Sequence, residues 1–293
     1  MMKIVSECGR EIKFYLYKYI YINIYNMKSK NVYPILERNN KTQYYTKYGY
    51  VILYNNDVYL NGEIFKQGNY HDEDTMLKLK KYIDPNKNIL EIGANCGTSS
   101  LVYASFLNNG SKLFAYEPQK NMFELLNLNI INNSLQEKIL PINKGIFCYN
   151  GKAIMNSIDL DGGGGDVEKR YTVEQNLPCN FAGIGLGNNG EKIDVVTIDS
   201  LDLDNIGFIH CDAQGSENFI FSEAISTLKK YKPVILYENY DFYGKYLYEN
   251  VCKCYPSYEK NSVFDIKKFC IEELGYSKYI DRFNGGIDTL LIP

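Results

Sequence analysis

From Asn88 to the C-terminus, short apolar runs alternate with segments of helical periodicity. The runs NILEI, KLFAY, KILPIN, IGFIHC and PVILYE have the length and the β-branched content of buried strands. Between two of them, QKNMFELLNLNII places Met122, Leu125, Leu126 and Ile130 on one helical face. GTSSLVYASFL, SENFIFSEAISTLKK and VFDIKKFCIEEL have the same character. This alternation predicts an α/β fold with a mostly parallel, doubly wound sheet and helices on both faces.

Two further segments complete the predicted architecture. YSKYIDRFNGGIDTLLIP ends the chain as a hairpin around Asn-Gly-Gly, which predicts an antiparallel C-terminal edge strand. At the other end, YGYVILYNNDVYLNGEIF predicts a β-hairpin, and HDEDTMLKLKKYIDP predicts a helix that Pro85 ends. We therefore assign residues 1–85 to an N-terminal extension and 86–293 to the ligand-binding domain. A glycine-rich insertion near 159–192 is interpreted as a flexible loop, or as a lid over the substrate if it has a function.

Composition narrows the classes of function. The 293 residues carry a net charge of −3 without a long run of Lys or Arg, which argues against nucleic acid as the main partner. With two His and eight scattered Cys, the chain has no zinc-site pattern. The aromatic run IKFYLYKYIYINIY is too short for a membrane span and Lys13 and Lys18 interrupt it. We expect a cytoplasmic protein without a membrane partner, whose N-terminal segment could cover a partner subunit in a homo-oligomer.

The segment NILEIGANCGTSS joins a predicted strand to a predicted helix through a glycine-containing turn. In a doubly wound sheet this turn lies where ligands bind, at the carboxyl ends of the strands. A dinucleotide turn would have a second glycine where this chain has Asn95, and that glycine lets a pyrophosphate approach the backbone. The lysine of a phosphate-binding loop is also missing. The turn therefore favours a ligand without a pyrophosphate.

Two acids complete this pattern. Glu117 ends the next strand, 24 residues after Gly93, where a carboxylate can accept hydrogen bonds from both hydroxyls of a ribose. Glu91 precedes the turn and suits a positively charged ligand. A ribose, a cationic group and no diphosphate together describe S-adenosylmethionine. The alternative is a glycine-containing turn beside a solvated acid, without a ligand.

At these residues the sequence resembles the FkbM-type methyltransferases. ILEIGANCGTSS is similar to that family's D-I-G-A-N-x-G motif, FAYEP to its F-E-P, VVTIDSL to its T-L-D-x-L, and FIHCDAQGSE to its L-K-I-D-V-E-G-A-E. The resemblance implies a Rossmann-like class I methyltransferase that O-methylates sugars or secondary metabolites. His210 replaces the family's Lys and Gln214 its Glu, so an acid–base or metal-binding role is not transferred to position 214.

The strand IGFIHC ends beside the predicted cofactor turn and supplies the catalytic candidates. Asp212 is the first candidate for the general base, His210 for a supporting or proton-shuttling group, and Glu238 for a second base. Glu217 is interpreted as a favourable first-turn acid without catalytic duty. Asp212, Gln214 and Glu238 make an incomplete set of metal ligands, so a divalent metal stays unassigned.

The full prediction is an S-adenosylmethionine-dependent O-methyltransferase that acts on a sugar, a glycan or a small hydroxylated metabolite. Two alternatives are a catalytically degenerate S-adenosylmethionine-binding module and an RNA ribose methyltransferase; a nicotinamide oxidoreductase is a third. Tyr70 and Glu73 fit either closure over the methionine end of the cofactor or simple packing. The predicted cofactor-binding residues are Tyr70, Glu91, Gly93, Ala94, Asn95, Gly97, Thr98, Glu117, Asn143 and Asp212.

Overall fold

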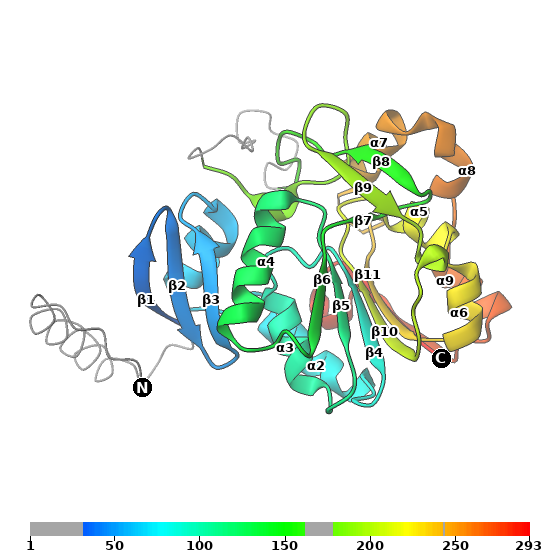
Figure 1. Cartoon of the computed structure of the whole chain (residues 1–293). Coiled ribbons are helices and arrows are strands. Elements are labelled where there is room, and N and C mark those ends of the chain that lie inside the picture. Colours follow the sequence, from blue (N-terminus) through cyan, green and yellow to red (C-terminus); the bar gives the residue numbers. More distant parts are fainter. Residues whose placement is uncertain (1–31, 162–177, 243) are drawn as a thin grey trace, which may run out of the picture.

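The computed structural model of the protein describes residues 32–161, 178–242 and 244–293, and a seven-stranded sheet runs through its centre (Figure 1). In spatial order its strands are β12 (Lys278–Ile280), β13 (Asp288–Ile292), β11 (Val234–Glu238), β10 (Ile206–Cys211), β4 (Asn88–Ile92), β5 (Leu113–Tyr116) and β6 (Ile139–Ile142). The five strands from β11 to β6 are mutually parallel. β13 pairs antiparallel with β11, and β12 pairs antiparallel with β13. The predicted mostly parallel sheet with an antiparallel C-terminal strand is confirmed, and this strand, β13, lies between β11 and the edge strand β12.

Apolar side chains cover both faces of this sheet, because successive residues of a strand point to opposite sides. Ile89 faces one hydrophobic core and Leu90 faces the other. The first core is completed by α2 (Glu73–Leu79), α3 (Thr98–Phe106) and α4 (Lys120–Asn132). The second is completed by α6 (Ile225–Tyr231) and α9 (Ile266–Lys268), and α5 (Glu217–Ser222) contributes to both. The remaining α-helices among the described residues are α7 (Lys245–Cys254) and α8 (Glu259–Ser262).

Two predicted helices are interrupted. SENFIFSEAISTLKK forms α5 and α6, because Asp199 accepts hydrogen bonds from the backbone N–H groups of Ser226 and Thr227 and so starts a new helix. VFDIKKFCIEEL begins at the cap residue Asp265, runs through α9 and continues as a π-helical segment, η8 (Phe269–Glu273). One of these caps, Asp199, is distant in sequence from the helix that it starts, so the periodicity of the segment does not predict it.

The N-terminal part of the described chain forms a three-stranded antiparallel sheet of β1 (Val32–Arg38), β2 (Lys41–Thr46) and β3 (Gly49–Tyr54). The prediction of further strands in NNDVYLNGEIF is wrong. This segment forms a π-helical turn, η1 (Val58–Ile64), whose first N–H groups, at Tyr59 and Leu60, donate to the Asp57 carboxylate. The division at residue 85 stays a prediction, and residues 1–31 lie outside the described chain.

The segment between β6 and β10 contains a second small sheet, on either side of the predicted glycine-rich loop. This sheet has the order β7 (Gly145–Ile146), β9 (Lys192–Val196), β8 (Gly151–Ile154). Residues 162–177 of the predicted glycine-rich loop lie outside the described chain. Among the helices of the residues that the structure describes, none has the length and hydropathy needed to cross a lipid bilayer.

Candidate active site

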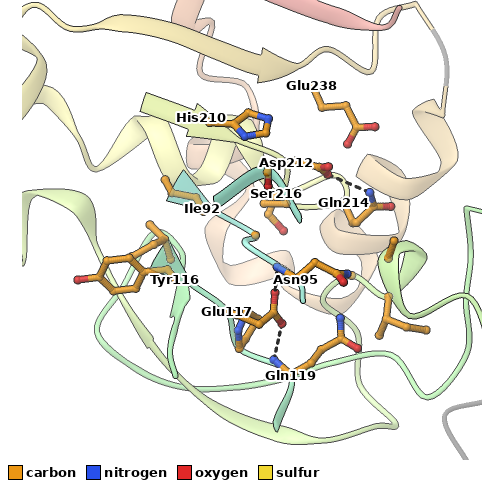
Figure 2. Close-up of a pocket in the computed structure, with 18 of the residues that line it drawn as sticks. Ile92, Asn95, Tyr116, Glu117, Gln119, His210, Asp212, Gln214, Ser216 and Glu238 are labelled. Atoms are coloured by element: carbon orange, nitrogen blue, oxygen red, sulfur yellow. Dashed lines mark hydrogen bonds between the residues drawn. The ribbon is translucent and has the colours of Figure 1, made fainter. Parts of the chain in front are cut away.

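A cavity of about 430 Å³, here called the first cavity, opens at the carboxyl ends of β4, β5, β10 and β11. Figure 2 shows side chains from these strand ends converging on it. Seven predicted site residues line it, namely Gly93, Asn95, Thr98, Glu117, His210, Asp212 and Glu238. Five others, Tyr70, Glu91, Ala94, Gly97 and Asn143, are absent from its wall.

The glycine turn, residues 93–97, is shaped by the packing of the protein itself. Gly93 has φ +84°, and a Cβ there would lie 1.9 Å from the carbonyl oxygen of Asp212. Gly97 has φ +89°, and its Cβ would lie 2.7 Å from Leu126 Cδ1. Both positions are in the left-handed region, which glycine adopts without steric cost. The glycines therefore allow the β4 turn to contact the β10 loop and helix α4.

The backbone N–H groups of the glycine turn are already bonded. Those of Gly93 and Ala94 both donate to the carbonyl oxygen that ends β5, at 3.0 Å. That of Asn95 donates to Glu117 Oε2 at 2.8 Å, and that of Cys96 to Asn95 Oδ1 at 2.7 Å. A phosphate-binding turn offers such N–H groups to its ligand. In this turn, four consecutive N–H groups bond to the protein instead.

Glu117 is buried at the wall of the first cavity and anchors the turn. Its exposed fraction is 2 %. Oε2 accepts the Asn95 N–H and Oε1 accepts the Gln119 N–H at 2.7 Å. Burial raises the pKa of this carboxyl to about 8, although the two hydrogen bonds favour its ionised form. Asn143 supports the backbone at Glu117 without lining the cavity. Its Nδ2 donates to the carbonyl oxygens of Glu117 and Pro118 at 2.9 and 3.0 Å.

The prediction that Glu91 faces a cationic ligand is wrong. Its exposed fraction is 0 %, and its two oxygens accept hydrogen bonds from the hydroxyls of Ser99 and Ser100, each at 2.5 Å. Glu91 therefore ties the end of β4 to the first turn of α3. Burial raises its pKa to about 7.

Tyr70 and Glu73 also contribute to packing. The Tyr70 hydroxyl donates to the carbonyl oxygen of Thr98 at 2.8 Å, and its ring lies 4.9 Å from that of Tyr48. Glu73 pairs with Lys47 at 2.6 Å. Tyr70 thus fixes the backbone of Thr98 in the first turn of α3, but it is absent from the cavity wall.

The loop after β10 presents Asp212 to the first cavity. The Asp212 N–H donates to the carbonyl oxygen of Ile92, and its Oδ1 accepts a hydrogen bond from Gln214 Nε2 at 3.1 Å (Figure 2). Gln214 has φ +51°, so the chain reverses tightly at this residue. Glu217 stabilises the reversal, because its Oε1 accepts the Ala213 N–H at 2.7 Å.

His210 belongs to β10 and lines the first cavity. Its Nδ1 is 4.0 Å from Glu91 Oε1, and this nitrogen has no hydrogen-bond partner within the described ranges. Its ring packs edge-on against Tyr103, with centroids 5.6 Å apart. Burial lowers the pKa of His210, although the charge of Asp212 acts in the opposite direction. The imidazole is therefore neutral near neutral pH.

Glu238 ends β11 and has an exposed fraction of 8 %. Its Oε2 accepts a hydrogen bond from the Tyr240 hydroxyl. Burial, followed by the charge of Asp212, raises its pKa well above the ordinary value. Within residues 32–161, 178–242 and 244–293, no group of three or more His, Cys, Asp or Glu side chains has a metal-binding arrangement. A metal stays unassigned.

Several polar residues of the cavity wall were missed from the sequence, namely His71, Asp72, Gln119, Asp161 and Asp288. Asp288 could have been found. It begins β13, and an antiparallel strand begins at the sheet edge where its parallel neighbours end. It lies opposite Glu238, and burial raises its pKa to about 7.

Several solved structures resemble this fold. The methyltransferase FkbM from Methylobacillus flagellatus KT aligns with a TM-score of 0.44 and 13 % identity over 71 % of this chain and 44 % of that chain. The O-methyltransferase from Bacillus cereus in complex with SAH aligns with a TM-score of 0.41 and 15 % identity over 75 % of this chain and 79 % of that chain. A putative rRNA-methylase from Clostridium thermocellum aligns with a TM-score of 0.38 and 10 % identity over 74 % of this chain and 91 % of that chain. The chain thus spans less than half of the Methylobacillus protein.

No curated protein matches the chain. The family model of the methyltransferase FkbM domain matches residues 91–277, which is well over half of the sequence. The match begins at Glu91, includes the glycine turn, Glu117 and the Asp212 loop, and extends past β11. The sheet has the Rossmann-like order expected for class I methyltransferases, with its antiparallel strand next to β11. The chain belongs to the FkbM methyltransferase domain family.

Proposed function

We propose that the protein is an S-adenosylmethionine-dependent O-methyltransferase whose acceptor is a hydroxyl of a sugar, a glycan or a small hydroxylated metabolite. The observation that carries this proposal is the construction of the glycine turn. Its N–H groups are bonded within the protein, while the Glu117 carboxylate lines the cavity beside it. A ribose without a pyrophosphate suits such a site.

The charges of the cavity wall support the same ligand. Glu117, Asp212, Glu238 and Asp288 all line the first cavity, whereas Lys144 is the single Lys or Arg among the described lining residues. A wall with these acids and one Lys offers few positive partners to a diphosphate, whereas an ionised acid in it attracts a sulfonium or an ammonium group. The acidic wall therefore argues for a cationic nucleoside over a nicotinamide dinucleotide.

When bound, S-adenosylmethionine supplies a methyl group on a positively charged sulfur. The acceptor oxygen forms a bond to the methyl carbon as the carbon–sulfur bond breaks, and the hydroxyl proton must leave the oxygen. Asp212 is the proposed base, because it lines the cavity from a fixed loop. Gln214 Nε2 holds Asp212 Oδ1 at 3.1 Å, which orients the carboxylate. His210, held neutral by burial, supports this base without adding a positive charge beside the sulfonium.

The proposed role of Asp212 is tested with methyl-labelled S-adenosylmethionine and a panel of monosaccharides, methyl glycosides, phenolic alcohols and an RNA oligonucleotide. We expect the wild type to label a sugar or small alcohol. Asp212→Asn should lose about 10²–10⁴-fold in rate while still binding the cofactor, because the amide cannot accept the proton. Asp194→Asn is the control, since Asp194 is exposed on β9 and pairs with Lys152.

Three outcomes would contradict this account. Labelling of RNA alone would favour a ribose methyltransferase, and cofactor binding without transfer to any acceptor would favour a degenerate binding module. Full activity of Asp212→Asn would remove its role as the base. A homo-oligomer formed through the N-terminal segment stays a prediction, because residues 1–31 lie outside the described chain.

A further inference from the structure

A second cavity of about 260 Å³ adjoins the first, and Glu238 lines both. The wall of this second cavity includes Tyr240, Asp241, Lys245 and Tyr248. Figure 2 shows the Glu238 carboxyl on the side of Asp212 away from Glu117. Glu238 therefore separates the proposed reaction site from a second, polar cavity.

Tyr240 connects Glu238 to the second cavity. Its hydroxyl donates to Glu238 Oε2, and its ring belongs to the second cavity's wall but not to the first. The residue between them is fixed, because Asn239 Nδ2 donates to Thr289 Oγ1 at 3.1 Å and Asn239 Oδ1 accepts the Asp241 N–H at 3.0 Å. The position of Tyr240 is thus set by the backbone after β11.

The charges around Glu238 favour a protonated carboxyl. Asp212 faces it from the loop after β10, Glu217 from α5 and Asp161 from the segment after β8. Asp288 lies opposite Glu238 on β13. Burial and the charges of Asp212, Glu217 and Asp161 hold the pKa of Glu238 well above its ordinary value, and hydrogen bonding by Tyr240 opposes the shift only partly. Glu238 can then both give and accept a proton.

We propose that Glu238 and Tyr240 form a proton outlet, which passes the proton released from the acceptor hydroxyl to water in the second cavity. This inference rests on the proposed function. Every methyl transfer from a sulfonium to a hydroxyl releases one proton, which must leave the site before the next turnover. Asp212 passes its proton to Glu238 through water in the first cavity, which both residues line. When the Tyr240 hydroxyl turns from Glu238 Oε2 toward water in the second cavity, its oxygen accepts the Glu238 proton as its own proton passes to that water. Each group regains its starting number of protons.

The test is the pH profile of methyl transfer by Tyr240→Phe, with the acceptor that the wild type labels most strongly in the panel above. We expect kcat to fall by on the order of tenfold, with an unchanged KM for S-adenosylmethionine, because the exit step and not binding is impaired. Added imidazole, a small base that can enter from solvent, should restore the rate. Tyr248→Phe is the matched control. Tyr248 also lines the second cavity, but its hydroxyl donates to the carbonyl oxygen of Ser262 at 3.2 Å.

Glu238→Gln serves as a second variant, since it keeps the shape of the side chain but cannot relay a proton; it should show the same loss. A Tyr240→Phe enzyme with wild-type kcat and pH profile would overturn the outlet. So would a loss that imidazole does not relieve, or an equal loss in Tyr248→Phe. Failure of the proposed function is recognised separately, because the wild type would then label no hydroxylated acceptor.

Discussion

At the scale of single residues, Gly93 shows how the site depends on close contact between two loops. Its absent side chain leaves room for the carbonyl oxygen of Asp212, which a Cβ would approach to 1.9 Å. The sequence suggested that a ligand required this glycine. The structure instead places another part of the protein there, and that part carries the proposed base.

Gly93→Ala should therefore lower the free energy of unfolding by more than backbone strain alone would. The control is Gly110→Ala, because Gly110 also has a positive φ, +98°, but a Cβ added there would have no neighbour within 4 Å among the described residues. We expect about 1 kcal/mol of lost stability for Gly110→Ala, from strain. Gly93→Ala should lose at least twice as much and bind S-adenosylmethionine more weakly. Equal losses in chemical denaturation would contradict the contact with Asp212.

Glu117, His210 and Asp212 could be predicted to lie together, because each falls at or just beyond the carboxyl end of a parallel strand. Glu91 could not be placed correctly from position alone. The hydroxyls of Ser99 and Ser100 reach back to its carboxylate, and this pairing depends on the orientation of α3. Which acids face the ligand is thus decided by side chains on neighbouring elements.

At the scale of elements, helix α4 joins the small N-terminal sheet to the glycine turn through an asparagine. Asn129 Oδ1 accepts the Ile52 N–H at 2.6 Å, and its Nδ2 donates to the carbonyl oxygens of Ile52 and Cys96 at 3.2 and 2.8 Å. Asn133 bonds the Tyr50 backbone in the same way. Both asparagines pair with the free edge of β3, as another strand would. The periodicity of α4 predicted the helix but not this docking.

Asn129→Ala should destabilise the protein by about 2–3 kcal/mol, since it leaves buried backbone groups of Ile52 and Cys96 without partners. The control Asn127→Ala removes only one bond, to the Phe123 carbonyl oxygen of the same helix, and should cost much less. Denaturant titration measures both. A loss of stability in Asn129→Ala no larger than that in Asn127→Ala would contradict the proposed link between α4, β3 and the glycine turn.

At the scale of the whole molecule, the described chain holds several carboxyl groups in its interior. Burial raises the pKa of Glu91 to about 7 and those of Glu117 and Glu217 to about 8, from an ordinary value of 4.5. Between these values the unfolded chain has released protons that the folded protein retains. The free energy of unfolding therefore falls as pH rises through this range. His210, whose pKa is lowered from 6.5, opposes this trend only below about 6.5.

Without ligand, stability should thus decrease from about pH 6.5 to 8, by about 1 kcal/mol per pH unit for each carboxyl that titrates there. Thermal unfolding across this range measures the slope. Glu217→Gln, which removes one of these groups, should make it shallower. A midpoint that rises with pH, or a slope unchanged in Glu217→Gln, would contradict the burial of these carboxyls as protonated acids.

The parallel sheet and its closing hairpin were predictable because hydrophobic patterns repeat over many residues. The sheet of β7, β8 and β9 was not, because these strands are short and their pairing joins segments about 40 to 50 residues apart. The cavity wall likewise draws on the turn before α2, which brings His71 and Asp72 to the site, and on β13, which brings Asp288. Long-range assembly of this kind leaves little trace in local sequence.

The central claim is that Glu117 and the glycine turn hold the nucleoside of S-adenosylmethionine. Calorimetric titration of the cofactor into wild type, Glu117→Gln and Glu124→Gln tests it most directly, since Glu124 is an exposed acid that pairs with Lys41. We predict binding by the wild type and by Glu124→Gln. Glu117→Gln should bind at least about tenfold more weakly, because an amide NH₂ replaces one of the two oxygens that can accept hydrogen bonds from the ribose. No binding by the wild type, or equal affinity in Glu117→Gln, would contradict the account.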